Sequence, residues 1–338
     1  MVRCGAFVSY DYIITCITRH FMYSNGSTTS FAPHPHARPN TLIAVLAGLR
    51  IGYGLPAELW LMIHESYLSE GLVATVSADG GLSIYDLDTM SHVALPRMIR
   101  ATACCLVPQR DVVVVATGSR LDLLEMITWE VQASVSNESV VHCCLCSPDG
   151  MVLYAMTAHD ITKWDISQSP QLQQRTTTRV RTTFYADLNA AGTILVVAGQ
   201  CGDVEVWDTV REEFISYFSV HVNDIYECVL FDNSVYTAGD DGQLCCTDLS
   251  TRSTSVVHQT RCSALSCAVS RELYVHLTES SLTVFDKRTN KTVYELSDDK
   301  ANFIHCAFTP NEQYLVILPM AGPILVWSVA GHLFYMTN

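Results

Sequence analysis

The chain has 338 residues, a formal net charge of −14, 49% hydrophobic residues and 16% charged residues. This apolar content can build a large core and excludes a chain dominated by disorder. The acidic balance disfavours a nucleic-acid backbone or an anionic membrane as the main partner, because both would repel it.

Residues 1–40 are predicted to form an N-terminal extension and linker. Residues 24–40 are rich in Pro, Ser, Thr, Gly and Asn, which do not build a packed face. His34 and His36 have no further ligand nearby in the sequence, so we expect no metal site there. The apolar run Leu42–Leu49 is much shorter than the roughly 20 residues that a membrane helix needs. We therefore expect neither a cofactor nor a membrane anchor in this part.

A repeating unit follows this extension. Each unit consists of a short apolar strand, a tight polar turn and a second strand that ends in an aromatic residue and an acid. The residues that close the units are spaced 38 to 43 positions apart: Asp86, Glu125, Asp165, Asp208, Asp248, Asp286 and, in the last unit, Ser328. This spacing is typical of one four-stranded propeller blade per repeat. The sequence therefore predicts an all-β chain, a seven-bladed β-propeller of four-stranded antiparallel blades over residues 41–338.

The first unit illustrates the pattern. Val73–Ser77 leads through Ala78–Gly81 to Leu82–Asp86. The first run is nearly continuous in apolar residues, as expected for a strand buried on both faces, and the second alternates. Aspartate and glycine lie between them, where a hairpin needs positive φ or a side chain that binds the backbone.

The pairs that close the third and fourth units are Trp164-Asp165 and Trp207-Asp208. At these residues, and with degenerate pairs in the other units, the chain resembles the WD-repeat (WD40) family over roughly residues 58–330. The resemblance implies rigid propeller blades and a hydrogen-bonded His, Ser or Thr, Trp and Asp tetrad within a blade. No unit carries the whole tetrad, so we expect blade rigidity to depend more on apolar packing.

The fifth unit comes nearest to that tetrad. It carries His221, Thr237 and Asp241, and Thr247 where the Trp belongs.

Two segments compete for the outer strand that closes the ring. Thr41–Gly48 precedes the first predicted inner strand, Glu58–His64, and the tail His332–Thr337 follows the seventh unit. We favour the N-terminal segment, because it is longer and would join the chain ends along a full edge.

The fourteen cysteines lie mostly on predicted strands. Cys143 and Cys146 have metal-like spacing, but alternate side chains of a strand point to opposite faces, so these two thiols should diverge. We expect free thiols packed as small apolar residues in a reducing compartment, which indicates the cytoplasm or the nucleus.

One candidate partner site is a cationic cluster between the third and fourth units. Arg175, Arg179 and Arg181 lie in a Thr-rich connection of an otherwise acidic chain. They could bind an acidic or phosphorylated segment of another protein. The alternative is an edge strand protected by charge.

A second candidate site is predicted on the fifth unit. His221, Asp224, Tyr226, Asp240 and Asp241 should converge at one face of its blade, because the loop that enters the inner strand and the next hairpin turn lie at the same end. The alternative role of these residues is the partial structural tetrad. The segment also looks faintly like one blade of the WD-repeat methylesterase of diphthamide synthesis.

Motifs of common catalytic sites are missing from the sequence, including a nucleophile elbow and a phosphate-binding glycine loop. The sequence therefore predicts a non-catalytic WD-repeat scaffold for protein–protein interactions, a subunit of a multiprotein complex. A diphthine methylesterase-like hydrolase is the alternative.

Overall fold

A computed structural model describes the chain over residues 72–76, 82–86, 91–94, 101–107, 110–126, 128–168, 173–180, 185–298, 302–309, 312–319, 324–329 and 333–336. The predicted extension 1–40, the segment Thr41–Gly48 and the predicted inner strand Glu58–His64 lie outside the described residues.

The described chain is built from antiparallel sheets whose strands follow one another along the sequence. The first sheet contains β1 (Leu72–Val76), β2 (Leu82–Asp86) and β3 (Ser91–Ala94). The second contains β4 (Ala103–Leu106), β5 (Val112–Thr117), β6 (Arg120–Glu125) and β7 (Val131–Ser136). The third contains β8 (Cys143–Cys146), β9 (Val152–Met156), β10 (Asp160–Asp165) and β11 (Gln173–Arg179). The fourth contains β12 (Tyr185–Leu188), β13 (Ile194–Ala198), β14 (Asp203–Asp208) and β15 (Glu213–Ser219), with the short 3-10 helix η1 (Gln200–Gly202) before β14.

The remaining sheets repeat this order. The fifth contains β16 (Ile225–Phe231), β17 (Ser234–Gly239), β18 (Gln243–Asp248) and β19 (Ser253–Gln259). The sixth contains β20 (Ser266–Val269), β21 (Leu273–Leu277), β22 (Ser281–Asp286) and β23 (Thr292–Ser297). The seventh contains β24 (Phe303–Phe308), β25 (Tyr314–Pro319), β26 (Ile324–Ser328) and β27 (Leu333–Met336).

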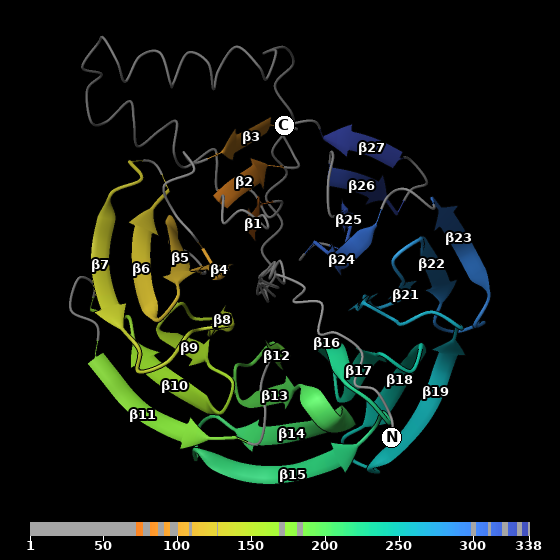
Figure 1. Cartoon of the computed structure of the whole chain (residues 1–338), viewed down its shortest axis with the longest axis horizontal. Coiled ribbons are helices and arrows are strands. Elements are labelled where there is room, and N and C mark those ends of the chain that lie inside the picture. Colours follow the sequence, from red (N-terminus) through yellow and green to blue (C-terminus); the bar gives the residue numbers. More distant parts are fainter. Residues whose placement is uncertain are drawn as a thin grey trace, which may run out of the picture.

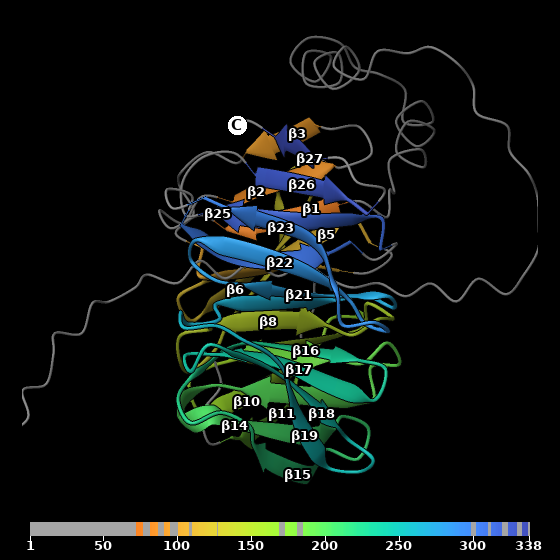
Figure 2. The same ribbon diagram turned by 90° about the vertical axis from the view of Figure 1, so that its right-hand side faces the viewer.

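The sheets are arranged as a β-propeller. Figure 1 shows them around a central axis, with the first strand of each sheet near the axis and the last at the rim. Figure 2 shows the same ring from its edge. The predicted all-β propeller class is therefore confirmed. Six described sheets have four strands and the first has three, so seven complete blades stay a prediction.

The acid that closes each unit shapes the turn that follows it. The carboxylate of Asp208 accepts the backbone N–H groups of Val210 at 2.9 Å and Arg211 at 2.8 Å. Asp248 and Asp286 accept backbone N–H groups of their turns in the same way. These backbone hydrogen bonds lower the pKa of all three carboxyl groups. The recurring acid is thus explained by turn geometry.

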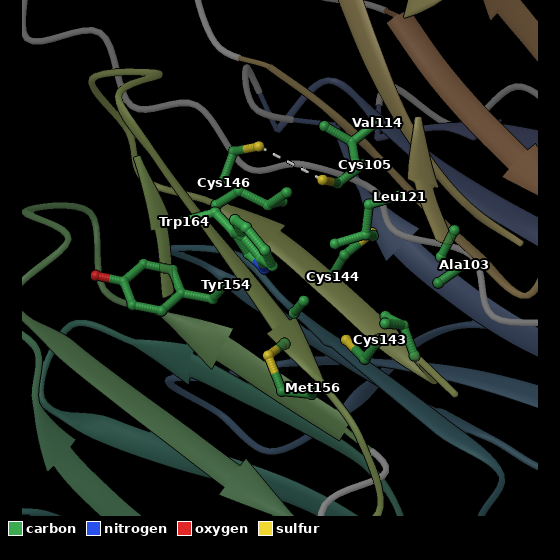
Figure 3. Packing of buried hydrophobic residues seen from close by; sticks show 14 of the residues in the cluster. Ala103, Cys105, Val114, Leu121, Cys143, Cys144, Cys146, Tyr154, Met156 and Trp164 are labelled. Atoms are coloured by element: carbon green, nitrogen blue, oxygen red, sulfur yellow. Dashed lines mark hydrogen bonds between the residues drawn. The ribbon is translucent and has the colours of Figure 1, made fainter. Parts of the chain in front are cut away.

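The core lies between neighbouring sheets and includes several cysteines. Cys105 Sγ on β4 lies 3.5 Å from Cys146 Sγ on β8, and Cys143 and Cys144 are buried beside them (Figure 3). Burial, with the neighbouring thiols of Cys144 and Cys146, raises the pKa of Cys105. The sulfur of Cys146 is directed toward Cys105, whereas that of Cys143 lies apart from it (Figure 3). The cysteines in the described part are thiols and form no disulfide among themselves.

The expectation that the N-terminal segment supplies the last outer strand was wrong. The tail forms β27, which pairs with β26 from Ile324 opposite Met336 to Trp327 opposite Leu333. The outer position of the seventh sheet is therefore taken by the tail. A hairpin within one unit closes a short loop, whereas a strand from the other end of the chain would close a very long one at a higher entropy cost.

Candidate functional site on the fifth sheet

The predicted site on the fifth sheet has a buried part and an exposed part. The buried part is formed by His221, Thr237 and Asp241. His221 Nδ1 lies 2.9 Å from Asp241 Oδ1, and His221 Nε2 lies 2.8 Å from Thr237 Oγ1. His221 is 5% exposed and Thr237 is fully buried. Both ring nitrogens are therefore engaged inside the sheet.

The surroundings hold this histidine in place. A side chain at Gly239 would put its Cβ 2.5 Å from His221 Nδ1, so only glycine leaves room for the ring. Burial alone would raise the pKa of Asp241, but its bonds to His221 and to the backbone of Gln243 outweigh burial and lower it. A carboxylate thus faces the imidazole, as in a structural network.

The hydrogen-bond network of His221, Thr237 and Asp241 does not extend to Thr247, which stands where the WD-repeat pattern has tryptophan. Thr247 is 1% exposed, and its hydroxyl lies 2.9 Å from that of Thr254 on β19. The partial tetrad that the sequence offered as the alternative role is therefore formed, as His221–Thr237–Asp241, without a fourth member from β18.

The exposed part is centred on Asp240, at the hairpin between β17 and β18. Its Oδ1 accepts hydrogen bonds from Ser263 Oγ at 2.8 Å and from the Tyr226 hydroxyl at 3.3 Å. Its Oδ2 accepts one from Asn223 Nδ2 at 3.3 Å. Donors from three places in the chain therefore fix one exposed carboxylate. We call Asn223, Tyr226, Asp240 and Ser263 the Asp240 cluster.

Asp224 lies at the same face and links two sheets. Its Oδ1 accepts the backbone N–H of Cys201 at 3.2 Å, and its carbonyl accepts the backbone N–H of Asp240 at 2.9 Å. The side chain of Val222 is 85% exposed beside them. The five residues predicted to converge therefore do lie at one end of the fifth sheet, but His221 and Asp241 serve its interior. A binding role for the other three stays a prediction.

The arginine cluster is described only in part. Arg175 and Arg179 belong to β11, the rim strand of the third sheet, and Arg179 is exposed opposite Asp160. Arg181 and the side chain of Arg175 lie outside the described residues. Partner binding by these arginines stays a prediction.

The structure also shows a polar cluster that the sequence interpretation missed. Glu227 Oε2 lies 2.8 Å from His305 Nδ1, and Ser266 Oγ lies 3.2 Å from the same nitrogen. The three residues occupy matching positions on the inner strands β16, β20 and β24, opposite Ala238, Leu277 and Leu318. Ser266 is fully buried and Glu227 is 9% exposed. The cluster ties three neighbouring sheets together near the axis.

The described part shows neither a metal-binding cluster nor a membrane-spanning helix. No group of three or more His, Cys, Asp or Glu side chains there is placed to hold a metal ion. No described helix is long and apolar enough to cross a membrane.

Comparison with known proteins identifies the fold. No family model matches the chain, and no curated protein matches it. Among solved structures, the β-propeller domain of Cps50 (Swd1) from Myceliophteria thermophila is similar, with a TM-score of 0.64 and 17% identity. The match covers 77% of this chain and 94% of that domain. Since 1736 solved chains match, the likeness shows a widespread fold and leaves the function open.

Proposed function

We propose that this chain is a non-catalytic WD-repeat scaffold that binds other proteins and serves as a subunit of a multiprotein complex. The observation that carries the proposal is the Asp240 cluster, in which an exposed carboxylate is held by Ser263, Tyr226 and Asn223. A group that is already fixed loses little conformational entropy when a partner binds. A rigid propeller face of this kind suits recognition of a protein segment.

The chemistry of this face favours a cationic segment. Asp224 and Asp240 lie together in a chain of net charge −14, so a Lys or Arg side chain would gain a charge-assisted hydrogen bond there. Val222, 85% exposed, offers an apolar contact beside the acids. The arginines of β11 would form a separate surface for an acidic or phosphorylated segment.

The buried histidine supports a non-catalytic role. A general base needs a ring nitrogen within reach of the substrate, yet both nitrogens of His221 are engaged by Thr237 and Asp241. In the Glu227–Ser266–His305 cluster the serine is fully buried. We also infer a cytoplasmic or nuclear location, because cysteines packed in the core without disulfides suit a reducing compartment.

The test uses the full chain as bait in an extract of the cells that make it. We expect Asp240→Asn to release the proteins that bind this face, and the matched rim variant Glu295→Gln to keep them. Glu295 is exposed on β23, so the control removes one charge away from the site. If every partner is retained by Asp240→Asn, the proposed face is wrong.

A second assay distinguishes the scaffold from the alternative function, a diphthine methylesterase-like hydrolase. Purified chain is incubated with methyl ester substrates, and the expected result is no turnover. Turnover that is lost on changing His221 would instead establish a hydrolase.

A further inference from the structure

A small polar pocket lies between the second and third sheets, which are neighbours in the ring (Figure 1). Its walls come from the end of β7 and the residues that follow it, from the hairpin between β9 and β10, and from β10 and β11. Its volume is about 310 Å³, part of which is open to solvent. Every lining residue carries a polar or charged side chain. We call this the Asn137 pocket.

Two of its lining side chains are buried without a partner. Asn137 is 9% exposed and Thr162 is 4% exposed. Neither the amide of Asn137 nor the hydroxyl of Thr162 has a hydrogen-bond partner in the described structure. The hydroxyl of Thr157 beside them, in contrast, accepts the backbone N–H of Asp160 at 3.1 Å. Because buried polar groups normally have a partner, the two unpaired groups point to a ligand that would bind them.

The pocket takes the place of the histidine network of the fifth sheet. Asn137 lies four positions before Val141, whose backbone N–H binds the turn between the second and third strands of the preceding sheet. His221 lies four positions before Ile225, which makes the same kind of bond. Asparagine is shorter than histidine, and Ala155 stands where the fifth sheet has its threonine. The third sheet therefore keeps polar groups here without the partners that would satisfy them.

The charge of the pocket favours a cation. Glu138 and Asp160 line it, and no Lys, Arg or His is among its described lining residues. Arg179 is opposite Asp160 in the β10–β11 pair, and it is exposed and makes no ion pair with Asp160 in the described structure. Hydrogen-bond acceptors are therefore in excess. A guanidinium group offers five N–H donors and no acceptor, and it can bind a carboxylate through two of them.

We propose that the Asn137 pocket binds an arginine side chain of a protein partner. The guanidinium donates to the carboxylate of Asp160, and the side-chain oxygens of Asn137 and Thr162 accept its other N–H groups. Val140, 46% exposed next in sequence to the mouth of the pocket, offers an apolar contact for the stem of the arginine. A lysine has three donors on one atom and would satisfy fewer of these separate acceptors.

The test titrates the purified full chain with N-acetyl-arginine amide, followed by ligand-observed NMR. All variants carry Asp240→Asn, so that a cation bound at the Asp240 cluster does not contribute and the two sites can fail separately. We expect a Kd of about 1 mM, because a single side chain makes few contacts. The neutral isostere N-acetyl-citrulline amide should bind at least about tenfold more weakly, and added salt should weaken the arginine probe.

Three substitutions in this background test the pocket itself. Asp160→Asn and Thr162→Val should each weaken the arginine probe at least about fivefold. Thr162→Val removes a hydroxyl that has no partner in the described structure, so its thermal unfolding temperature should not fall. Arg179→Gln removes a competing cation and should strengthen binding about twofold. Glu295→Gln, exposed on the rim strand β23, is the matched charge control and should change nothing.

Several results would overturn the proposal. They are equal binding of the arginine and citrulline probes, an unchanged affinity in Asp160→Asn or Thr162→Val, and no binding of the arginine probe up to about 50 mM. Displacement of the probe by Ca²⁺ at about 10 mM would also overturn it, because an oxygen-lined site that prefers an inorganic cation is not an arginine pocket.

Discussion

The buried histidine of the sixth sheet gives the most quantitative prediction. His276 on β21 is 1% exposed, and its Nε2 has no hydrogen-bond partner in the described structure. The ring of His258 from β19 packs edge-on against it, with centroids 4.9 Å apart. Burial, helped by His258, lowers the pKa of His276 to about 4, although the Gly242 backbone opposes the shift.

This lowered pKa makes folding sensitive to acid. Because the folded pKa lies below the ordinary value of 6.5, the unfolded chain binds a proton that folded His276 does not. The contribution to stability is complete above pH 6.5 and is lost as the pH falls toward 4. Since one pKa unit is worth about 1.4 kcal/mol, a change from about pH 7 to about pH 5 removes about 2 kcal/mol of unfolding free energy.

The assay is urea unfolding of wild type and His276→Gln at both pH values. Burial also lowers the pKa of His142 and His258, so wild type loses more than the contribution of His276 alone. The variant should therefore lose about 2 kcal/mol less than wild type. His258→Gln is the control and should retain most of the effect, because burial is the larger cause. Equal losses in wild type and His276→Gln would refute this reasoning.

Three further predictions concern stability and thiol access. Trp164 Nε1 is buried without a partner in the described structure, and Ala155 lies diagonally across on β9. The hydroxyl of Ala155→Thr could accept the indole N–H, so the unfolding free energy of this variant should exceed that of its isostere Ala155→Val by about 1 kcal/mol. A Val variant that is more stable than the Thr variant would contradict this. A double-mutant cycle of Glu227→Ala and His305→Ala should give an interaction free energy of about 1–3 kcal/mol between the two side chains. If the effects of the two substitutions on the unfolding free energy simply add, the two side chains do not stabilise the contact between sheets. Cys105 should resist alkylation in the folded protein and react in urea, as read by mass spectrometry, and labelling at native pH would contradict its burial.

Much of the propeller could be predicted because each unit is specified locally. A buried strand, a turn and an acid such as Asp248 act within one hairpin, so their pattern is visible in one stretch of sequence. The outer strand of the seventh sheet was assigned wrongly, because Thr41–Gly48 and Leu333–Met336 both have strand character. The two segments differ in the entropy cost of closing the loop that brings them to β26, and the strand pattern of the sequence does not include this cost.

The candidate site could be predicted where its residues share one unit, and not where they come from several. Tyr226 lies on β16, and Asp224 and Asp240 flank the ends of β16 and β17 in the same sheet, so the three residues were expected together. Glu227 and His305 come from different repeats, and their contact depends on how the sheets pack around the axis. The sequence did contain a signal for this contact: Glu227 and His305 occupy matching positions near the start of their inner strands, where most repeats carry apolar or small residues.

One buried position of the second strand shows how the repeats tolerate different polar content. In the fifth sheet Thr237 occupies it and binds His221, and in the sixth His276 occupies it without a partner for Nε2. In the third sheet Ala155 is there, which leaves Trp164 unsatisfied. The backbone register is the same in all three sheets. Backbone pairing and apolar packing therefore hold each sheet whatever this residue is, and a polar network at this position adds stability to a sheet that is already formed.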